Sequence, residues 1–228
     1  MELISFLLQV AALTLLAALP SIHAEPVVNL PYPMEADKQY NVTIEQRIAP
    51  NDENRKRANA YRVYLALSPP GWGTGPVCWL AYQVDLDTTH VNITIPADAA
   101  PDKTRIRLST ALIKKGKPRS MGFSYSGRTT LDGANGTWSR KQLEGRNLID
   151  QDELSCWAYG CAKTCYDTYY APKGEEDGPI GDKAYACAKQ CAKDLNPKND
   201  GALNVMSVSR VLAVAVMVGF IHMLASVL

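Results

Sequence analysis

The chain has 228 residues, and its 24 Lys and Arg nearly balance its 23 Asp and Glu, so the formal net charge is +1. A nucleic-acid-binding protein needs a clear excess of basic residues, so this balance argues against a nucleic-acid partner. Of the three His, His23 and His222 lie in terminal apolar segments that we expect to be removed. Because only His90 remains, we exclude His-dependent triads and His-rich metal sites, and predict no catalytic residue, metal or cofactor.

The first segment has the order of a secretory signal peptide. Residues 3–19 are largely apolar, Pro20 follows, and the small residue Ala24 ends the segment. We therefore predict a signal peptide over residues 1–24, with cleavage after Ala24. A signal anchor is the alternative, but the apolar run is short for a membrane span.

Residues 25–140 place apolar side chains at every second position, which is the period of a strand with one buried face. Turn-forming residues such as Pro69-Pro70-Gly71 separate the runs, and the charged segment 47–57 is expected to be a solvated loop. About seven short strands in about 100 residues predict an Ig-like β-sandwich in a mainly β protein. The strands are expected at residues 27–31 and 39–46, and on the alternating sets Tyr61/Val63/Leu65/Leu67, Cys78/Leu80/Tyr82/Val84, Val91/Ile93/Ile95, Ile106/Leu108/Leu112 and Met121/Phe123/Tyr125.

Trp72 is the candidate ligand-binding residue. It lies between Pro69 and Pro76 in a loop rich in Gly and Pro, and an exposed aromatic ring can stack on a sugar face. The alternative is that Trp72 folds back to cover the end of the sandwich or the helical segment. Trp79 is expected in the core, and Trp157 and Tyr169 are expected between the helices and the sandwich.

Three Asn-x-Thr sequons predict N-glycosylation at Asn41, Asn92 and Asn135, which fits passage through the secretory pathway. In the first two, the flanking apolar residues alternate inward. This phase leaves Asn41 and Asn92 on the outer surface of their strands.

The β-rich part of the chain carries three motifs: Asn92 to Pro101 (NITIPADAAP), Arg105 to Leu108 (RIRL), and Gly122 to Gly127 (GFSYSG) with Leu131 and Gly133. In these motifs, residues 27–135 resemble the Ig-like N-terminal domain of fungal GPI-anchored cell-surface proteins related to the cell-wall synthesis family implicated in β-1,6-glucan. The resemblance implies a role at the cell wall and no catalytic site. It ends after residue 135, because a cysteine-rich segment replaces the Ser/Thr-rich stalk of that family.

Residues 141–196 change to a helical pattern. Residues 150–170 and 182–195 each place apolar and Cys residues on one helical stripe, and a Gly- and Pro-containing segment separates them. We expect two antiparallel helices, the first capped by Asp150 or Asp152 and the second by Asp182. The acids near the first helix start are interpreted as caps rather than as a glycosidase pair.

All six Cys lie between the two terminal signals, so three disulfides are expected in an oxidising compartment. Two Cys-x3-Cys units place their sulfur atoms on one face of each helix, because residues four apart share a face. Antiparallel helices then pair Cys161 with Cys191 and Cys165 with Cys187. The remaining helical Cys156 lies about 140° around the helix from Cys161, which favours a bond to Cys78 of the sandwich. A zinc site on the four paired Cys is the alternative.

The last segment resembles a GPI-attachment signal, which we place at residues 197–228. The small residues Asn199-Asp200-Gly201 precede a short polar spacer, and residues 211–228 form an apolar tail. This order predicts lipid attachment at Asn199 and removal of the tail. A type I membrane span and a soluble form are the alternatives.

These observations lead to three functional hypotheses. We favour a non-enzymatic GPI-anchored protein of the extracellular face of the plasma membrane or the cell wall, which binds or organises wall polysaccharide. The first alternative is a secreted or anchored enzyme acting on wall glycans, which requires two carboxylates converging in a cleft. The second is a surface protein for adhesion or host interaction. The sequence names neither the polysaccharide nor a protein partner.

Overall fold

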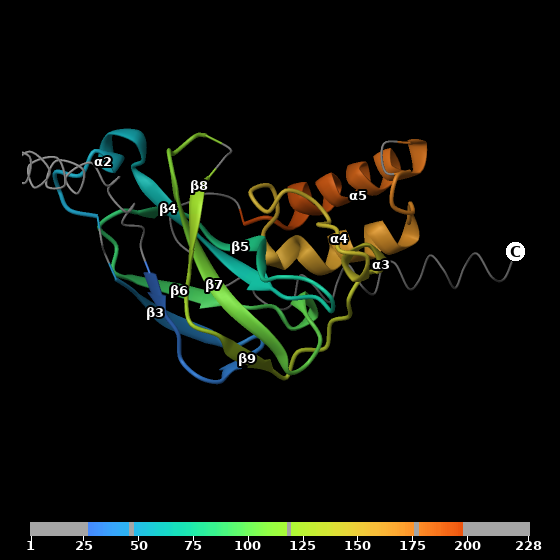
Figure 1. The fold of residues 1–228 in the computed structure, drawn as a ribbon, viewed down its shortest axis with the longest axis horizontal. Helices are drawn as coiled ribbons and strands as arrows, with labels where there is room; N and C mark the ends of the chain where they lie inside the picture. The colour runs from blue at the N-terminus through green and yellow to red at the C-terminus, as the bar shows by residue number, and fades with distance from the viewer. Residues whose placement is uncertain (1–26, 46–47, 118–119, 176–177, 198–228) are drawn as a thin grey trace, which may run out of the picture. The chain divides into compact units, whose positions relative to one another are not determined.

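The computed structural model describes residues 27–45, 48–117, 120–175 and 178–197 (Figure 1). The predicted signal peptide, Asn199 and the apolar tail lie outside the described residues. Contacts join the strands and helices, up to Leu195, into one unit. Within the described part of the chain, no helix is both long and apolar enough to cross a membrane.

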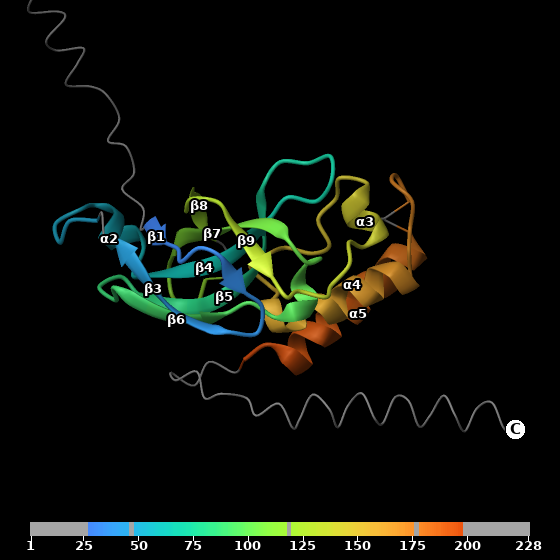
Figure 2. The ribbon, with the colours of Figure 1, turned by 90° about the horizontal axis from the view of Figure 1, so that it is seen from below.

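The protein is mainly β, with two sheets (Figures 1 and 2). The three-stranded sheet has the order β1-β3-β6 and is antiparallel. The six-stranded sheet has the order β2-β9-β7-β4-β5, and β8 also pairs with β7. The strands are β1 Val27–Asn29, β2 Met34–Glu35, β3 Gln39–Glu45, β4 Ala60–Leu67, β5 Gly75–Asp85, β6 His90–Thr94, β7 Thr104–Ile113, β8 Met121–Tyr125 and β9 Thr129–Asp132.

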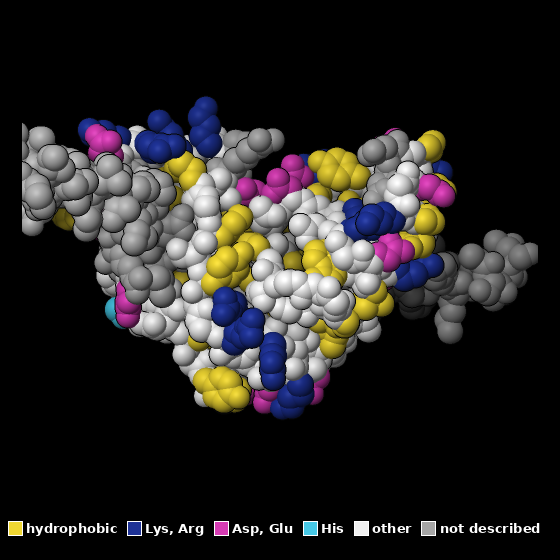
Figure 3. Space-filling view, viewed as in Figure 1, with side chains coloured by type: hydrophobic (Ala, Val, Ile, Leu, Met, Phe, Trp, Pro, Cys, Tyr) yellow, Lys and Arg dark blue, Asp and Glu magenta, His cyan; other side chains and the backbone are white. Residues whose placement is uncertain are grey.

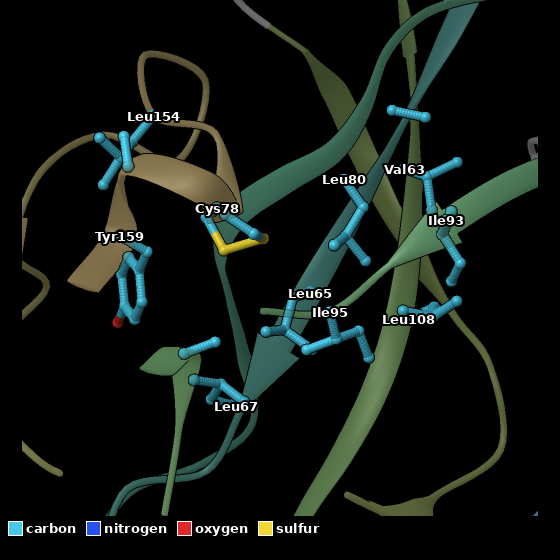
Figure 4. Close-up of a cluster of buried hydrophobic side chains, with 14 of the residues drawn as sticks. Val63, Leu65, Leu67, Cys78, Leu80, Ile93, Ile95, Leu108, Leu154 and Tyr159 are labelled. Atoms are coloured by element: carbon cyan, nitrogen blue, oxygen red, sulfur yellow. A yellow bond between two sulfur atoms is a disulfide. The ribbon is translucent and has the colours of Figure 1, made fainter. Parts of the chain in front are cut away.

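The two sheets contribute side chains to one buried core. Apolar residues from β4, β5 and β7 meet residues of β6 and of the segment that follows it, because alternate side chains of each strand point to the same side. Burying each such Leu or Ile stabilises the fold by about 1.5–3 kcal/mol. Figure 4 shows Val63, Leu65, Leu80, Ile93, Ile95 and Leu108 gathered in this core.

All seven predicted strands are present, and the structure adds the short strands β2 and β9. The alternations predicted for β5 and β8 are wrong in part. A bulge in β5, between the pairs Tyr61–Val84 and Val63–Ala81, shifts the alternation, so Tyr82 leaves the core set and packs with Trp79 in a second cluster. Phe123 also belongs to this second cluster, on the outer surface of the six-stranded sheet.

The helices start and end at different residues from those predicted. The described helices are α2 Asn54–Arg57, the 3-10 turn η1 Ala97–Ala99, α3 Arg140–Leu143, α4 Cys156–Thr168 and α5 Pro179–Leu195. Ser155 caps α4, because its hydroxyl accepts the Ala158 N–H, so Asp150 and Asp152 are not the caps. Asp182 lies inside the first turn of α5.

Three disulfides are present, and they are the three predicted pairs. Cys78 of β5 is bonded to Cys156 at the start of α4. Cys161–Cys191 and Cys165–Cys187 join α4 to α5, which lie side by side (Figures 1 and 2). The described cysteines are thus all in disulfides, which argues against the alternative zinc site.

Candidate functional site

The outer surface of the six-stranded sheet carries a cluster of aromatic side chains from three strands. Strand pairing places Trp79 of β5 beside Tyr64 of β4. The Tyr64 and Phe123 rings meet edge to face with their centroids 5.4 Å apart, and the Trp79 and Tyr82 centroids lie 5.0 Å apart. Tyr125 lies on β8, one strand beyond β7. We call this set the aromatic face: Tyr64, Trp79, Tyr82, Phe123 and Tyr125.

Three of these rings reach solvent. Tyr64 and Trp79 are buried, whereas Tyr82, Phe123 and Tyr125 are half-buried. Figure 3 shows apolar side chains gathered over β8 and a row of Lys and Arg side chains continuing along β7. Burial raises the pKa of Tyr125, although the nearby Arg107 partly offsets this effect, so its phenol stays neutral at physiological pH. The aromatic face therefore offers neutral aromatic contact area, although its neighbouring rings are tilted or edge to face rather than parallel.

A buried ion pair supports the aromatic face. The Arg62 side chain is fully buried, and its Nη1 donates to Asp152 Oδ1 at 2.5 Å. The same carboxylate accepts the Tyr64 hydroxyl at 2.5 Å and the Ser120 N–H at 3.0 Å. The guanidinium also lies 4.1 Å from the centre of the Tyr82 ring. Asp152 thereby fixes the segment before α4 against the sheet, and the charge of its carboxylate is balanced by Arg62.

The sequence pattern did not indicate this pair. Arg62 and Tyr64 occupy the positions of β4 that alternation assigns to solvent, but every residue of β4 is buried. The cause is the segment before α4, which runs along β5, where the backbone N–H of Trp79 donates to the Leu154 carbonyl at 2.9 Å. The available signal was the pattern Arg62-Val63-Tyr64, which places an Arg and an aromatic residue on one face of a strand.

Trp72 lies apart from the aromatic face, in the loop joining β4 to β5. Its Nε1 donates to the backbone carbonyl of Gln142 at 2.7 Å, and the Trp72 side chain is half-buried. Gln142 in turn donates to the Tyr159 hydroxyl of α4 at 2.7 Å. Trp72, Gln142 and Tyr159 line a cavity of about 30 Å³, which is room for about one water molecule. This geometry favours the packed alternative for Trp72 over a free sugar-stacking role.

Of the other Trp predictions, Trp79 is buried, as expected, although it lies in the second cluster. Trp157 is 44% exposed and Tyr169 is 38% exposed, so the prediction that both pack between the helices and the sheets is wrong. Trp157 follows the buried Cys156 on α4, and the bond to Cys78 turns that cysteine toward the sheet and its neighbour outward.

Lys163 provides a second connection between α4 and the strands, inside the first Cys-Ala-Lys-x-Cys unit. It is only 6% exposed, and its ammonium group donates to the carbonyls of Asp98, Ala99 (3.3 Å) and Thr137 (3.1 Å). Burial lowers the pKa of Lys163, and the nearby carboxylates of Asp98 and Asp167 oppose that shift. In the second unit, Lys189 remains at the surface and pairs with Glu153 at 3.1 Å.

Asp98, in η1, is exposed as a residue, but its carboxyl group lies between α4 and the charges of Lys163 and Asp37. Burial raises its pKa, Lys163 opposes the rise, and the negative charge of Asp37 adds to it. Its side chain lies against α4 at Gly160, where a Cβ atom would be 1.8 Å from Oδ2. Asp37 accepts the Ala97 N–H at 2.9 Å. His90 is exposed at the start of β6.

The three sequons lie at the surface. Asn41 and Asn92 face each other on β3 and β6, and Asn41 Nδ2 donates to Asn92 Oδ1 at 2.7 Å. Their exposure fits the predicted phase, and Asn135 is also exposed. Glycans at Asn41 and Asn92 would cover the outer surface of the three-stranded sheet.

No protein-family model matches this chain, and no curated protein is significantly similar to it.

Proposed function

We propose that this chain is a non-enzymatic GPI-anchored protein of the extracellular face of the plasma membrane or the cell wall that binds wall polysaccharide. The half-exposed rings of Tyr82, Phe123 and Tyr125 on one sheet surface carry the proposal. Sugar rings present flat C–H surfaces, and aromatic side chains contact them with little loss of rotamer entropy. The resemblance to the fungal wall-protein family also favours a role at the cell wall.

We further propose that the two sheets form an Ig-like β-sandwich and that α4 and α5 form a disulfide-stapled antiparallel hairpin. The shared core of the two sheets supports the sandwich. The pairing of Cys161 with Cys191 and of Cys165 with Cys187 supports opposite helix directions, because the earlier Cys of one helix is bonded to the later Cys of the other.

Co-sedimentation of the full-length chain with insoluble β-glucan, chitin and mannan tests the binding function. We expect retention on at least one wall polysaccharide and a clear loss of retention for Tyr125→Ala. Trp157→Ala is the matched control, because Trp157 is an exposed aromatic residue on α4, outside the aromatic face. Absence of binding to every polysaccharide, or equal losses in both variants, would contradict the proposal.

Treatment of expressing cells with a phosphatidylinositol-specific phospholipase tests the anchor. Release of the protein into the medium is expected for a GPI-anchored chain. Retention on the cells, together with a mature chain that still contains Leu228, would replace the lipid anchor with a membrane span.

An enzyme acting on wall glycans is the second candidate, and Asp98 is the observation that favours it. Burial of its carboxyl group and the charge of Asp37 raise its pKa against the opposing effect of Lys163, and a raised pKa is one property of a general acid. Assays for release of reducing sugar from the same polysaccharides distinguish the two functions. Activity that is lost in Asp98→Asn and retained in Tyr125→Ala would establish the enzyme.

A further inference from the structure

Three arginines lie together beside the aromatic face. Arg105 and Arg107 are two residues apart on β7, so they share the outer surface of the sheet at a spacing of about 7 Å. The pairing of β7 with β9 matches Arg105 with Thr130 and Ile106 with Thr129. Arg128 directly precedes β9, so continuing this register by one residue would bring it beside Arg107. We call this set the arginine row: Arg105, Arg107 and Arg128.

Among the described residues, no carboxylate forms an ion pair with the arginine row. No ion pair within the described part of the chain includes any of its members, whereas Arg55, Arg62 and Arg146 each pair with an acid. The next cation along the strand, Lys103, is paired with Asp132 at 2.7 Å. In a chain with a net charge of +1, three uncompensated cations on one surface form a local positive field.

Arg107 connects the arginine row to the aromatic face. Its guanidinium carbon lies 6.0 Å from the centre of the Tyr125 ring, at the outer limit of a cation–π contact. Its Nε is buried and has no hydrogen-bond partner among the described residues. Arg107 is half-buried, whereas Arg105 and Arg128 are exposed. A ligand lying on Tyr125 reaches the arginine row directly.

We propose that the aromatic face and the arginine row together bind an anionic polysaccharide, that is, a glycan carrying phosphate or carboxylate groups. The inference rests on the polysaccharide-binding function proposed above and specifies the class of glycan. Sugar rings lie on Phe123 and Tyr125, and the anionic groups accept hydrogen bonds from the guanidinium groups, whose planar fork matches phosphate and carboxylate oxygens.

The positive charges of the arginine row would also attract an anionic membrane, but the position of Phe123 and Tyr125 in the sheet surface favours a glycan as the ligand. A peripheral membrane protein inserts apolar side chains that project from its surface. Phe123 and Tyr125 are instead half-buried in the sheet surface, which suits stacking from above and leaves little to insert.

The test compares the full-length chain on a soluble β-glucan and on a phosphorylated preparation of the same glucan, at low and high salt. We expect the phosphorylated glucan to bind at least about tenfold more tightly, with the difference shrinking as salt screens the charges. The triple variant Arg105→Gln, Arg107→Gln, Arg128→Gln should lose this preference. Because Arg107 is half-buried, the double variant Arg105→Gln, Arg128→Gln provides a version that leaves the packed side chain in place.

The matched control removes three exposed lysines from the helical segment: Lys173→Gln, Lys183→Gln and Lys193→Gln. It changes the net charge equally and should keep the preference. Equal binding to both glucans overturns the anionic assignment and leaves the proposed function standing, whereas binding to neither overturns both. A preference lost equally in the control, or binding to anionic phospholipid vesicles without binding to phosphorylated glucan, also overturns the assignment.

Discussion

Replacing Asp152 with Asn should strongly destabilise the protein, because it removes the counter-charge of a fully buried arginine. The Arg62 and Asp152 side chains are 0% and 6% exposed, so water cannot replace the lost carboxylate. Breaking a buried ion pair by neutralising one partner costs about 3–5 kcal/mol. The Ser120 N–H also loses its acceptor if the new amide nitrogen takes the position of Oδ2.

For a domain of this size, that loss corresponds to a fall in the melting temperature of about 6–20 °C. Urea unfolding without reductant, which keeps the three disulfides intact, measures the free energy directly. The midpoint should fall while the slope m stays constant.

The double variant Arg62→Met, Asp152→Asn tests the reason for the effect. With the buried cation gone, its loss of stability should be smaller than the sum of the two single losses by about 1–3 kcal/mol. A loss below about 1 kcal/mol for Asp152→Asn, or strictly additive losses, would show that the pair is solvated and refute the reasoning.

Three further predictions concern the connections between the helices and the strands. Lys163→Met should lower the free energy of unfolding by about 1–3 kcal/mol, because buried carbonyls lose their donor, whereas the matched Lys189→Met should change it by less than about 1 kcal/mol in the same urea titration. Loss of Cys78–Cys156 through paired Ala substitutions should cost about 1.8 kcal/mol more than loss of Cys161–Cys191, since Cys78–Cys156 closes a separation of 78 residues, whereas the nested Cys165–Cys187 bridge leaves Cys161–Cys191 a loop of only about ten residues; calorimetry that reverses this order would contradict the chain-entropy account. Trp72→Ala should lower the melting temperature and leave polysaccharide binding unchanged; a stable variant with weakened binding would return Trp72 to the ligand-binding site.

The disulfides were predictable because helix geometry fixes them. Two Cys four residues apart must share a helix face, and the offset of Cys156 leaves it only Cys78. The strand positions were predictable for a similar reason, since one buried face imposes a period of two. The order of the strands was not, because pairing depends on contacts that are distant along the chain.

The aromatic face was missed because both surfaces of β4 are buried, which removes the contrast on which alternation depends. Tyr82 and Phe123 were counted with the core because register irregularities, which alternation cannot reveal, shift the phase of β5 and of β8. Lys163 was hidden because a Lys between two Cys of a helix is normally solvated. Only the approach of η1 to α4 makes it a buried donor.

The central claim is that polysaccharide binds on the aromatic face. Its most direct test is the Kd of the full-length chain and of the double variant Tyr82→Ala, Tyr125→Ala for the best-bound soluble polysaccharide, with Trp157→Ala as control and melting temperatures recorded for all. We predict that the double variant raises Kd at least about tenfold, which is the loss expected for two contact residues worth about 1 kcal/mol each, while Trp157→Ala leaves it unchanged. An unchanged Kd in a folded double variant would contradict the account.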